Sequence, residues 1–317
     1  MSEIIKKATR DAYGSALVEL AQTQPNLIVL DSDLAAATKT GAFKKACPER
    51  FFDCGIAEGN MMSIAAGLAS TGKVVFASSF AMFAAGRAFE QVRNSIGYTH
   101  LNVKIGATHG GISVGEDGAT HQCCEDIALM RSIPGMVVLN PADAVEARLA
   151  VMAAAAWEGP VYLRFGRLAV PVIFDDNYRF EIGKSVRLTE GNDVTIIATG
   201  LMVNEALIAA ETLKNEGISA RVINMATIKP LDRQAVIDAA VETGAIVTAE
   251  EHSVFGGLGS AVSEVVCEEK PVPVLRVGVE DTFGKSGPAA ELLKLFGLSA
   301  ENIVQKAKAA IAKKGSM

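Results

Sequence analysis

The sequence lacks an excess of basic residues. Its 317 residues carry 30 Lys and Arg against 36 Asp and Glu, which gives a formal net charge of −6. A protein that binds DNA or RNA uses Lys and Arg to contact phosphates, so we expect no nucleic-acid partner. Half of the residues (50%) are hydrophobic and 21% are charged, which excludes a disordered chain and leaves enough apolar mass for about two globular domains.

Long hydrophobic runs are also missing. The longest apolar stretch without a charge, 74–86, is closed by Lys73 and Arg87 and is shorter than the roughly 20 residues that cross a bilayer. A secretory signal would place a continuous apolar core near the N-terminus, whereas this chain has charged residues there: Glu3, Lys6, Lys7, Arg10 and Asp11. We therefore expect no membrane partner and a cytoplasmic location.

Cysteine is scarce, and the cysteines do not occur at the spacings of a disulfide framework or a zinc site. The five cysteines are odd in number and form no C-x-x-C pair, which argues against a disulfide framework and against a structural zinc site. The neighbours Cys123 and Cys124 leave a redox role open, but ordinary buried thiols are the favoured interpretation, because free cysteine is usually buried.

The order of apolar segments indicates an α/β fold. Short runs rich in β-branched residues alternate with longer Ala-rich stretches, a pattern typical of a parallel sheet with helices on its faces. Over residues 1–170 it predicts one domain with a doubly wound, mostly parallel sheet. The expected strands are 26–30, 51–54, 74–78, 102–105, 136–139 and 161–165, and the expected helices include 10–22, 59–69, 86–96 and 142–156.

A second, smaller α/β domain is expected at 194–317. Residues 171–193 lose periodicity and end in the turn-forming cluster 190–193, so we expect a linker there. The alternation then resumes, with expected strands 194–199, 220–224, 245–249 and 274–277 and expected helices 203–216, 233–242 and 259–268.

Ligands of open α/β sheets bind beyond the carboxyl ends of the strands, so polar residues there are the first site candidates. Glu58 begins an otherwise small and apolar helix; a favourable interaction with the helix dipole is the structural alternative. Phe80 and Phe83 end an apolar run and are placed to contact a flat ligand, although such residues more often belong to the core.

The glycine-rich segment 108–122 is the strongest site candidate. It contains four glycines, with His109 and His121 on either side of the acidic pair Glu116 and Asp117. Such a density of acid and base groups favours a reaction site. A metal site is the weaker alternative, because the two histidines lack helical i, i+4 spacing, and we expect no metal ligand in this chain.

Two cations and one more histidine complete the candidates. Arg164 and Arg167 follow the last strand of the first domain, where arginines either pair with carboxylates or bind a phosphate in a bidentate manner. His252 follows a strand of the second domain, and a structural role is the favoured interpretation for it.

Taken in order, these motifs resemble the C-terminal half of the transketolase family. The specific segments are GIAEGNMM at 55–62, SSFAMF at 78–83 and GEDGATHQ at 115–122, and the match runs over almost the whole chain. The resemblance implies a pyrimidine-binding domain of the thiamine-diphosphate type, followed by the small C-terminal domain of the family.

Two departures from the family pattern carry information. The Gly-Asp-Gly motif followed by Asn, which holds Mg²⁺ on the cofactor diphosphate in this family, is missing. The chain thus resembles one subunit of a split transketolase, and the resemblance implies a diphosphate-binding partner subunit that holds most of the Mg²⁺ site, in an α2β2 assembly. Where the family has a phosphate-contacting serine, the chain has three alanines and Thr38, which leaves open whether Thr38 replaces it.

The resemblance also assigns cofactor contacts. Glu58 matches the catalytic glutamate that hydrogen-bonds the aminopyrimidine ring of thiamine diphosphate, and a carboxyl group in an apolar pocket suits the sharing of a proton there. Phe80 and Phe83 match the aromatic residues that pack on this ring.

The same resemblance assigns substrate contacts. His109 matches a position near the sugar phosphate, and Asp117 and His121 match positions near the donor hydroxyl groups. Imidazoles move protons well near neutral pH, so His109 and His121 are both catalytic candidates. Arg167 and Arg10 match arginines that bind the substrate phosphate.

The function implied is transfer of a two-carbon ketol unit from a ketose phosphate to an aldose phosphate, as in pentose phosphate metabolism. One alternative is an enzyme that uses pyruvate or a 2-oxoacid, such as a deoxyxylulose phosphate synthase or the β subunit of a 2-oxoacid dehydrogenase. Another is a non-catalytic regulatory subunit that keeps the fold. For the C-terminal domain, we expect mainly a role in subunit contact.

Overall fold

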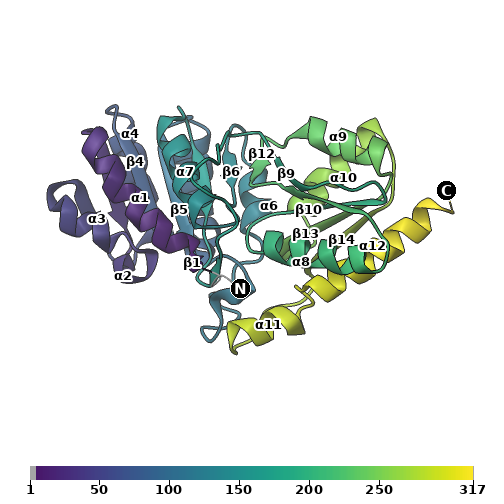
Figure 1. Cartoon of the computed structure of the whole chain (residues 1–317). Coiled ribbons are helices and arrows are strands. Elements are labelled where there is room, and N and C mark those ends of the chain that lie inside the picture. The colour runs from purple at the N-terminus through teal and green to yellow at the C-terminus, as the bar shows by residue number, and fades with distance from the viewer. Residues whose placement is uncertain (1–4, 317) are drawn as a thin grey trace.

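The computed structural model describes residues 5–316, which form two main β-sheets with helices on both faces of each (Figure 1). The first sheet has the strand order β12-β6-β7-β5-β4-β2-β3, and every neighbouring pair is parallel except β12 with β6. Its strands are β2 (Leu27–Asp31), β3 (Phe51–Asp53), β4 (Val74–Phe80), β5 (Val103–Thr108), β6 (Val137–Leu139), β7 (Val161–Arg164) and β12 (Thr227–Lys229).

Strand β2 shows why this sheet is covered on both faces. All five of its residues are buried, and since side chains alternate across a strand, Leu27 and Val29 join one hydrophobic cluster while Ile28 and Leu30 join the other. The first cluster is packed by α1 (Thr9–Thr23) and α7 (Ala144–Ala156). The second is packed by α4 (Glu58–Ala69), the π-helical segments η2 (Met82–Arg87) and η3 (Val92–Gly97), and α6 (Asp126–Arg131).

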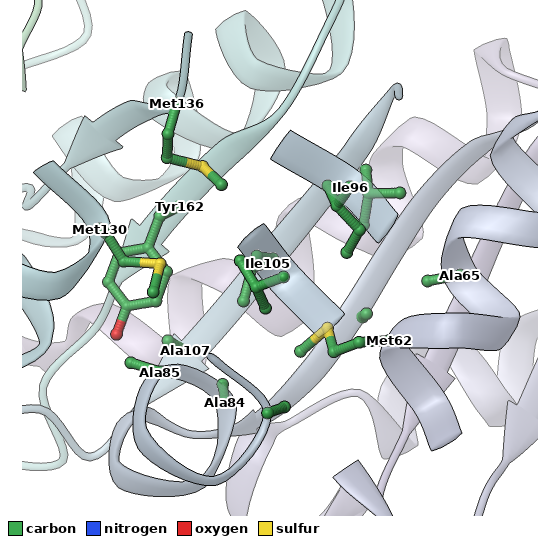
Figure 2. Packing of buried hydrophobic residues seen from close by; sticks show 14 of the residues in the cluster. Met62, Ala65, Ala84, Ala85, Ile96, Ile105, Ala107, Met130, Met136 and Tyr162 are labelled. Atoms are coloured by element: carbon green, nitrogen blue, oxygen red, sulfur yellow. The ribbon is translucent and has the colours of Figure 1, made fainter. Parts of the chain in front are cut away.

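Figure 2 shows the second cluster from close by. Met62 of α4 and Ile96 of η3 lie on the same side of the sheet as Ile105 of β5. Ala84 and Ala85 of η2 let the helical backbone come close to the sheet, because they present only methyl groups. Tight packing of this kind fixes the ends of β4 and β5, where the site lies.

Short elements complete the first half of the chain. Strands β1 and β8 pair with each other in an antiparallel ribbon, and several one-turn helices connect the longer elements. These are β1 (Lys6–Ala8), β8 (Ala169–Pro171), α2 (Ala35–Thr38), α3 (Gly41–Ala46), η1 (Pro48–Arg50), α5 (Phe89–Gln91) and η4 (Ile112–Val114).

The second sheet has the order β14-β13-β10-β11-β9, parallel except for the edge strand β9. Helices α8 and α12 pack on one face and α9 and α10 on the other, while α11 lies beneath the junction of the two sheets in Figure 1. The strands are β9 (Val186–Thr189), β10 (Val194–Ala198), β11 (Ala220–Asn224), β13 (Ile246–Ser253) and β14 (Val274–Val279), and the helices are α8 (Met202–Asn215), α9 (Arg233–Glu242), α10 (Leu258–Glu269), α11 (Ala289–Leu295) and α12 (Ala300–Lys314).

The predicted fold class is confirmed, and three local differences stand out. Strand β9 lies inside the segment expected as a linker, and β12 leaves the second half of the chain to extend the first sheet. Both are short antiparallel edge strands, too short to show a period of their own. The regular helix expected at 86–96 is instead η2, α5 and η3 in succession.

The structure bears on the expectations about membrane spans and cysteines. Among residues 5–316, no helix is long and apolar enough to cross a membrane. All five cysteines are free, and burial raises the pKa of both Cys123 and Cys124. Because the thiolate is the reactive form, this pair behaves as the ordinary buried thiols that the sequence favoured.

Candidate active site

The parallel register of β4 and β5 creates the site. Phe80 pairs with Thr108 at the carboxyl ends of the two strands, so the next residue after β5, His109, lies beside the Phe80 ring. The two rings are stacked with centroids 3.8 Å apart. Two candidates 29 positions apart in the sequence are therefore in direct contact.

Glu58 is the buried carboxylate of this site. It is the first residue of α4 and is 2% exposed, and its Oε2 accepts a hydrogen bond from Nη1 of Arg87 at 3.0 Å. The guanidinium of Arg87 also lies over the Phe83 ring, 4.6 Å from its centroid. Arg87 thus joins the carboxylate to the aromatic part of the site, a contact that sequence analysis missed although Arg87 follows Phe83 by one helical turn.

The aromatic rings form one continuous group. Phe80 and Phe83 lie roughly parallel with centroids 6.1 Å apart, and His121 meets the Phe83 ring edge-on at 5.3 Å. His121 is held by a hydrogen bond between its Nδ1 and Oγ1 of Thr120 at 2.9 Å. Predicted residues from η2 and from the glycine-rich segment therefore meet at the end of the sheet.

His109 is a neutral histidine with a defined tautomer. Arg10 Nη1 lies 3.0 Å from its Nε2, and because arginine has only donors, Nε2 accepts. The ring proton is then on Nδ1, which donates to Oγ1 of Thr108 at 2.8 Å. Burial, reinforced by the positive charges of Arg10 and Arg167, lowers the pKa of His109 to about 3.

Two arginines lie at one end of the site. Arg10, on α1, also donates to the carbonyl of Ala37 at 3.1 Å, and burial lowers its pKa, with the nearby charge of Arg167 acting in the same direction. Arg167 donates to the carbonyl of Val114 and to Oε2 of Glu116 at 3.4 Å. Asp117 lies 4.0 Å from the same guanidinium and its side chain is 45% exposed.

Arg164 does not belong to this cationic end. It is 3% exposed, and its Nε donates to Oδ2 of Asp126 at 2.8 Å, while Nη2 donates to the carbonyls of Cys123 and Glu251. The phosphate-binding role left open for Arg164 is therefore wrong, because Arg164 lies on β7, whose residues are all buried. Of the pair, only Arg167 faces the site.

Thr38 and His252 are both buried structural residues. The hydroxyl of Thr38 donates to Oδ2 of Asp31 at 2.7 Å, and its side chain is fully buried, so it does not stand in for a phosphate-contacting serine. His252 is also fully buried; its Nε2 accepts from the backbone of Ala128 at 3.4 Å and its Nδ1 lies 2.8 Å from the carbonyl of Ser253. The structural interpretation of His252 is confirmed.

The cluster suits a flat heteroaromatic group. Oε2 of Glu58 is taken by Arg87, and no hydrogen bond from residues 5–316 reaches Oε1, which leaves an acceptor for a ring nitrogen beside the exposed side of Phe83. A metal ion needs several ligand side chains close together. Among the same residues, no three His, Cys, Asp or Glu side chains form such a group. The chain thus presents a free carboxylate oxygen beside aromatic rings, a setting that suits a flat heteroaromatic group.

Comparison with known proteins agrees with this geometry. Residues 5–172 match the family model of the transketolase pyrimidine-binding domain, and residues 183–303 match that of the transketolase C-terminal domain. The chain therefore belongs to the transketolase family of transferases.

Its most similar relatives include split subunits of that family. A protein of Methanocaldococcus jannaschii described as a transketolase C-terminal section is 51% identical, over 95% of this chain and 96% of its own length. A 6-deoxy-6-sulfo-D-fructose transketolase subunit of a Clostridium species is 47% identical, over 94% and 92%. A solved split-gene transketolase, an inactive beta4 tetramer, is 57% identical with a TM-score of 0.91, over 97% and 99%.

Proposed function

We propose that this chain is the pyrimidine-binding subunit of a split transketolase, which transfers a two-carbon ketol unit from a ketose phosphate to an aldose phosphate. Thiamine diphosphate is the cofactor and supplies the carbon nucleophile when bound. The observation that carries the proposal is the cluster in which Arg87 links Glu58 to the Phe83 ring, with His121 on the other edge of that ring.

Glu58, Phe80 and Phe83 are proposed to hold the aminopyrimidine ring. The free Oε1 of Glu58 would share a hydrogen bond with a nitrogen of the ring. Arg87 keeps the other oxygen fixed at 3.0 Å. Phe80, which is 7% exposed and stacked on His109, supports the ring wall, and the half-buried Phe83 provides its contact face.

His121, Asp117 and His109 are proposed to contact the sugar. His121 and Asp117 lie on the open side of the site, where they meet the donor hydroxyl groups, and His121 moves the proton. His109 accepts a hydrogen bond from Arg10 through Nε2, so its contribution is to orient Arg10 and close the pocket rather than to carry charge.

The anionic end of the substrate is proposed to bind between Arg10 and Arg167. Arg10 lies on α1 and Arg167 lies in the loop between β7 and β8, and an arginine side chain stays charged in proteins. A phosphate accepts hydrogen bonds from both in a bidentate manner. The carboxylates of Glu116 and Asp117 near Arg167 hold this side chain in place until the anion binds.

A diphosphate-binding subunit is the proposed partner, and it would hold most of the Mg²⁺ site. Two findings support this: the split-subunit relatives are covered almost end to end, and a related split-gene transketolase of this kind is an inactive beta4 tetramer. We propose an α2β2 assembly in the cytoplasm, with pentose phosphates among its substrates.

The substrate that donates the two-carbon unit identifies the reaction. The chain mixed with a complementary diphosphate-binding subunit, thiamine diphosphate and Mg²⁺ is expected to consume a ketose phosphate in the presence of an aldose phosphate. Consumption of pyruvate or a 2-oxoacid, with no ketol transfer, would overturn the proposal in favour of the 2-oxoacid chemistry.

A further inference from the structure

The 110–122 loop carries site residues, yet it is held largely by the second domain. Ile112, in the one-turn helix η4 of this loop, is fully buried in the hydrophobic cluster of the C-terminal domain, together with Val279 and Leu292. Helix η4 packs against α11. The loop that presents Asp117 and His121 is thus part of the C-terminal core, although it follows a strand of the first sheet.

Glu251 makes the central polar contact between this loop and the second sheet. It lies on β13, is 3% exposed, and its Oε1 accepts a hydrogen bond from the backbone N–H of Ser113 at 2.6 Å. Gly111 has a φ of +85°, and a Cβ atom built there would lie 2.3 Å from Cδ of Glu251. Only glycine allows the loop backbone to approach the carboxylate so closely.

Two further contacts fix the same loop. Nη2 of Arg164 donates to the carbonyls of Cys123 and Glu251, at 3.2 and 2.9 Å, which ties the end of the loop to β13. Nε2 of Gln122 donates to the carbonyls of Ile112 and Lys285, at 3.2 and 2.8 Å. The loop therefore has anchors at its start and at its end, and both lead to the C-terminal domain.

We infer that Glu251 is a positioning residue, through which the C-terminal domain holds the 110–122 loop and thereby sets the place of Asp117 and His121 for the sugar. The effect of Glu251 is exerted through the Ser113 N–H, since its carboxyl group is buried away from any sugar. This inference rests on the proposed function only for its effect on sugar binding; the loop contact itself is independent of it.

The matched control is the preceding residue. Glu250 is 1% exposed and lies on the same strand, but its carboxylate accepts from the backbone N–H groups of Leu258 and Gly259 at the start of α10, at 2.7 and 2.8 Å. Glu250→Ala thus removes an equally buried carboxylate of the same domain without touching the loop.

The first test is amide hydrogen exchange of the chain itself, which needs no activity. Glu251→Ala is expected to speed exchange of residues 111–118, and Glu250→Ala to speed exchange at the start of α10 instead. Equal loop exchange in wild type and Glu251→Ala would overturn the inference, as would an equal effect of Glu250→Ala on the loop.

Two conservative variants distinguish the effect of the position of the carboxylate oxygen from the effect of its charge. Glu251→Gln keeps an oxygen at the distance of Ser113 N–H, so its loop exchange should stay near that of wild type. Glu251→Asp keeps the charge near Arg164 but withdraws the carboxylate by one methylene, so it should behave like Glu251→Ala. The opposite order would show that charge balance matters and would contradict the positioning role.

The second test uses the assembly with its diphosphate-binding subunit. Loss of the contact is expected to raise the KM for the ketose phosphate about tenfold, the scale for a buried backbone N–H left without its partner. The affinity for thiamine diphosphate should not change, and Glu251→Gln should keep the KM near that of wild type. An inactive wild-type assembly would reject the proposed function alone. An active wild type with an unchanged KM in Glu251→Asp would reject the inference alone.

Discussion

Arg10 Nη1 and His109 Nε2 are 3.0 Å apart, and this one contact fixes both the tautomer and the charge of a candidate catalytic histidine. The arginine only donates, so the imidazole accepts at Nε2 and remains neutral. One of the two histidines predicted to carry protons near neutral pH is thus held in a single protonation state.

His109 is expected not to titrate between pH 5 and pH 8. Its pKa is lowered to about 3, mainly by burial, so the folded chain binds this proton less tightly than the unfolded chain, whose histidine has a pKa near 6.5. Stability linked to His109 is therefore lost as the pH falls from about 6.5 toward 3. Nitrogen NMR of labelled histidine should show an Nδ1–H tautomer between pH 5 and pH 8. A titration midpoint near pH 6.5 for His109 would contradict the assignment.

Glu58→Ala is expected to lower ketol transfer at least about 100-fold, the usual scale for loss of a group that handles a proton. Assembly with the partner subunit should persist, because Glu58 is only 2% exposed at the start of α4 and presents almost no surface to a partner. Steady-state kinetics and sedimentation of the mixture measure the two effects. Glu49→Ala is the control, since that side chain is 68% exposed; undiminished transfer in Glu58→Ala would favour a non-catalytic subunit.

Arg164→Met is expected to destabilise the fold by about 3–5 kcal/mol, because it leaves the buried carboxylate of Asp126 without its charged partner. The exposed pair of Arg148 and Glu19, with side chains 48% and 46% exposed, provides the comparison, and Arg148→Met should cost about 1 kcal/mol or less. Chemical denaturation measures both. Equal losses would mean that the buried network of Arg164 contributes no more than a surface ion pair.

Glu146 should make the stability of the chain depend on pH. Burial raises its pKa from 4.5 to about 7, although the carboxyl group accepts hydrogen bonds from Tyr178 and Asn224. The folded chain then binds the proton more tightly, so this contribution to stability is present below pH 4.5 and is lost as the pH rises through about 7.

Glu146→Gln is expected to remove this dependence, which amounts to roughly 3 kcal/mol between the two pH limits. Denaturant unfolding of both proteins at pH 5 and pH 7.5 gives the difference directly, and other titrating groups cancel in the comparison. The same change in the free energy of unfolding between the two pH values in the variant and in wild type would contradict the raised pKa of Glu146.

Much of the fold could be predicted from the sequence because its strands are buried on both faces. The runs at 27–30 and 74–77 are continuously apolar and belong to strands whose residues are all buried, a pattern typical of a parallel sheet. The site residues Glu58, Phe83 and His121 could be named because they lie in motifs that resemble a family. The stacking of Phe80 on His109 follows from the register of β4 and β5.

Residues whose role depends on a distant partner could not be predicted. Glu251 contacts Ser113 across 138 positions, and nothing in its neighbourhood distinguishes it from Glu250. Arg164 and Arg167 looked alike in the sequence, but Arg164 lies on the fully buried strand β7, whereas Arg167 lies in the loop after it and is partly exposed. For the C-terminal domain, the subunit-contact role stays a prediction, and the contact of Glu251 with Ser113 is the basis of the inferred role in positioning the 110–122 loop.

The central claim is that a second subunit completes this site. Ketol transfer from a ketose phosphate to an aldose phosphate, with thiamine diphosphate and Mg²⁺, should be measured for the chain alone and for the chain titrated with a diphosphate-binding subunit. The account predicts no transfer by the chain alone and activity that saturates at one partner subunit per chain. Transfer by the chain alone, or none in the mixture, would contradict it.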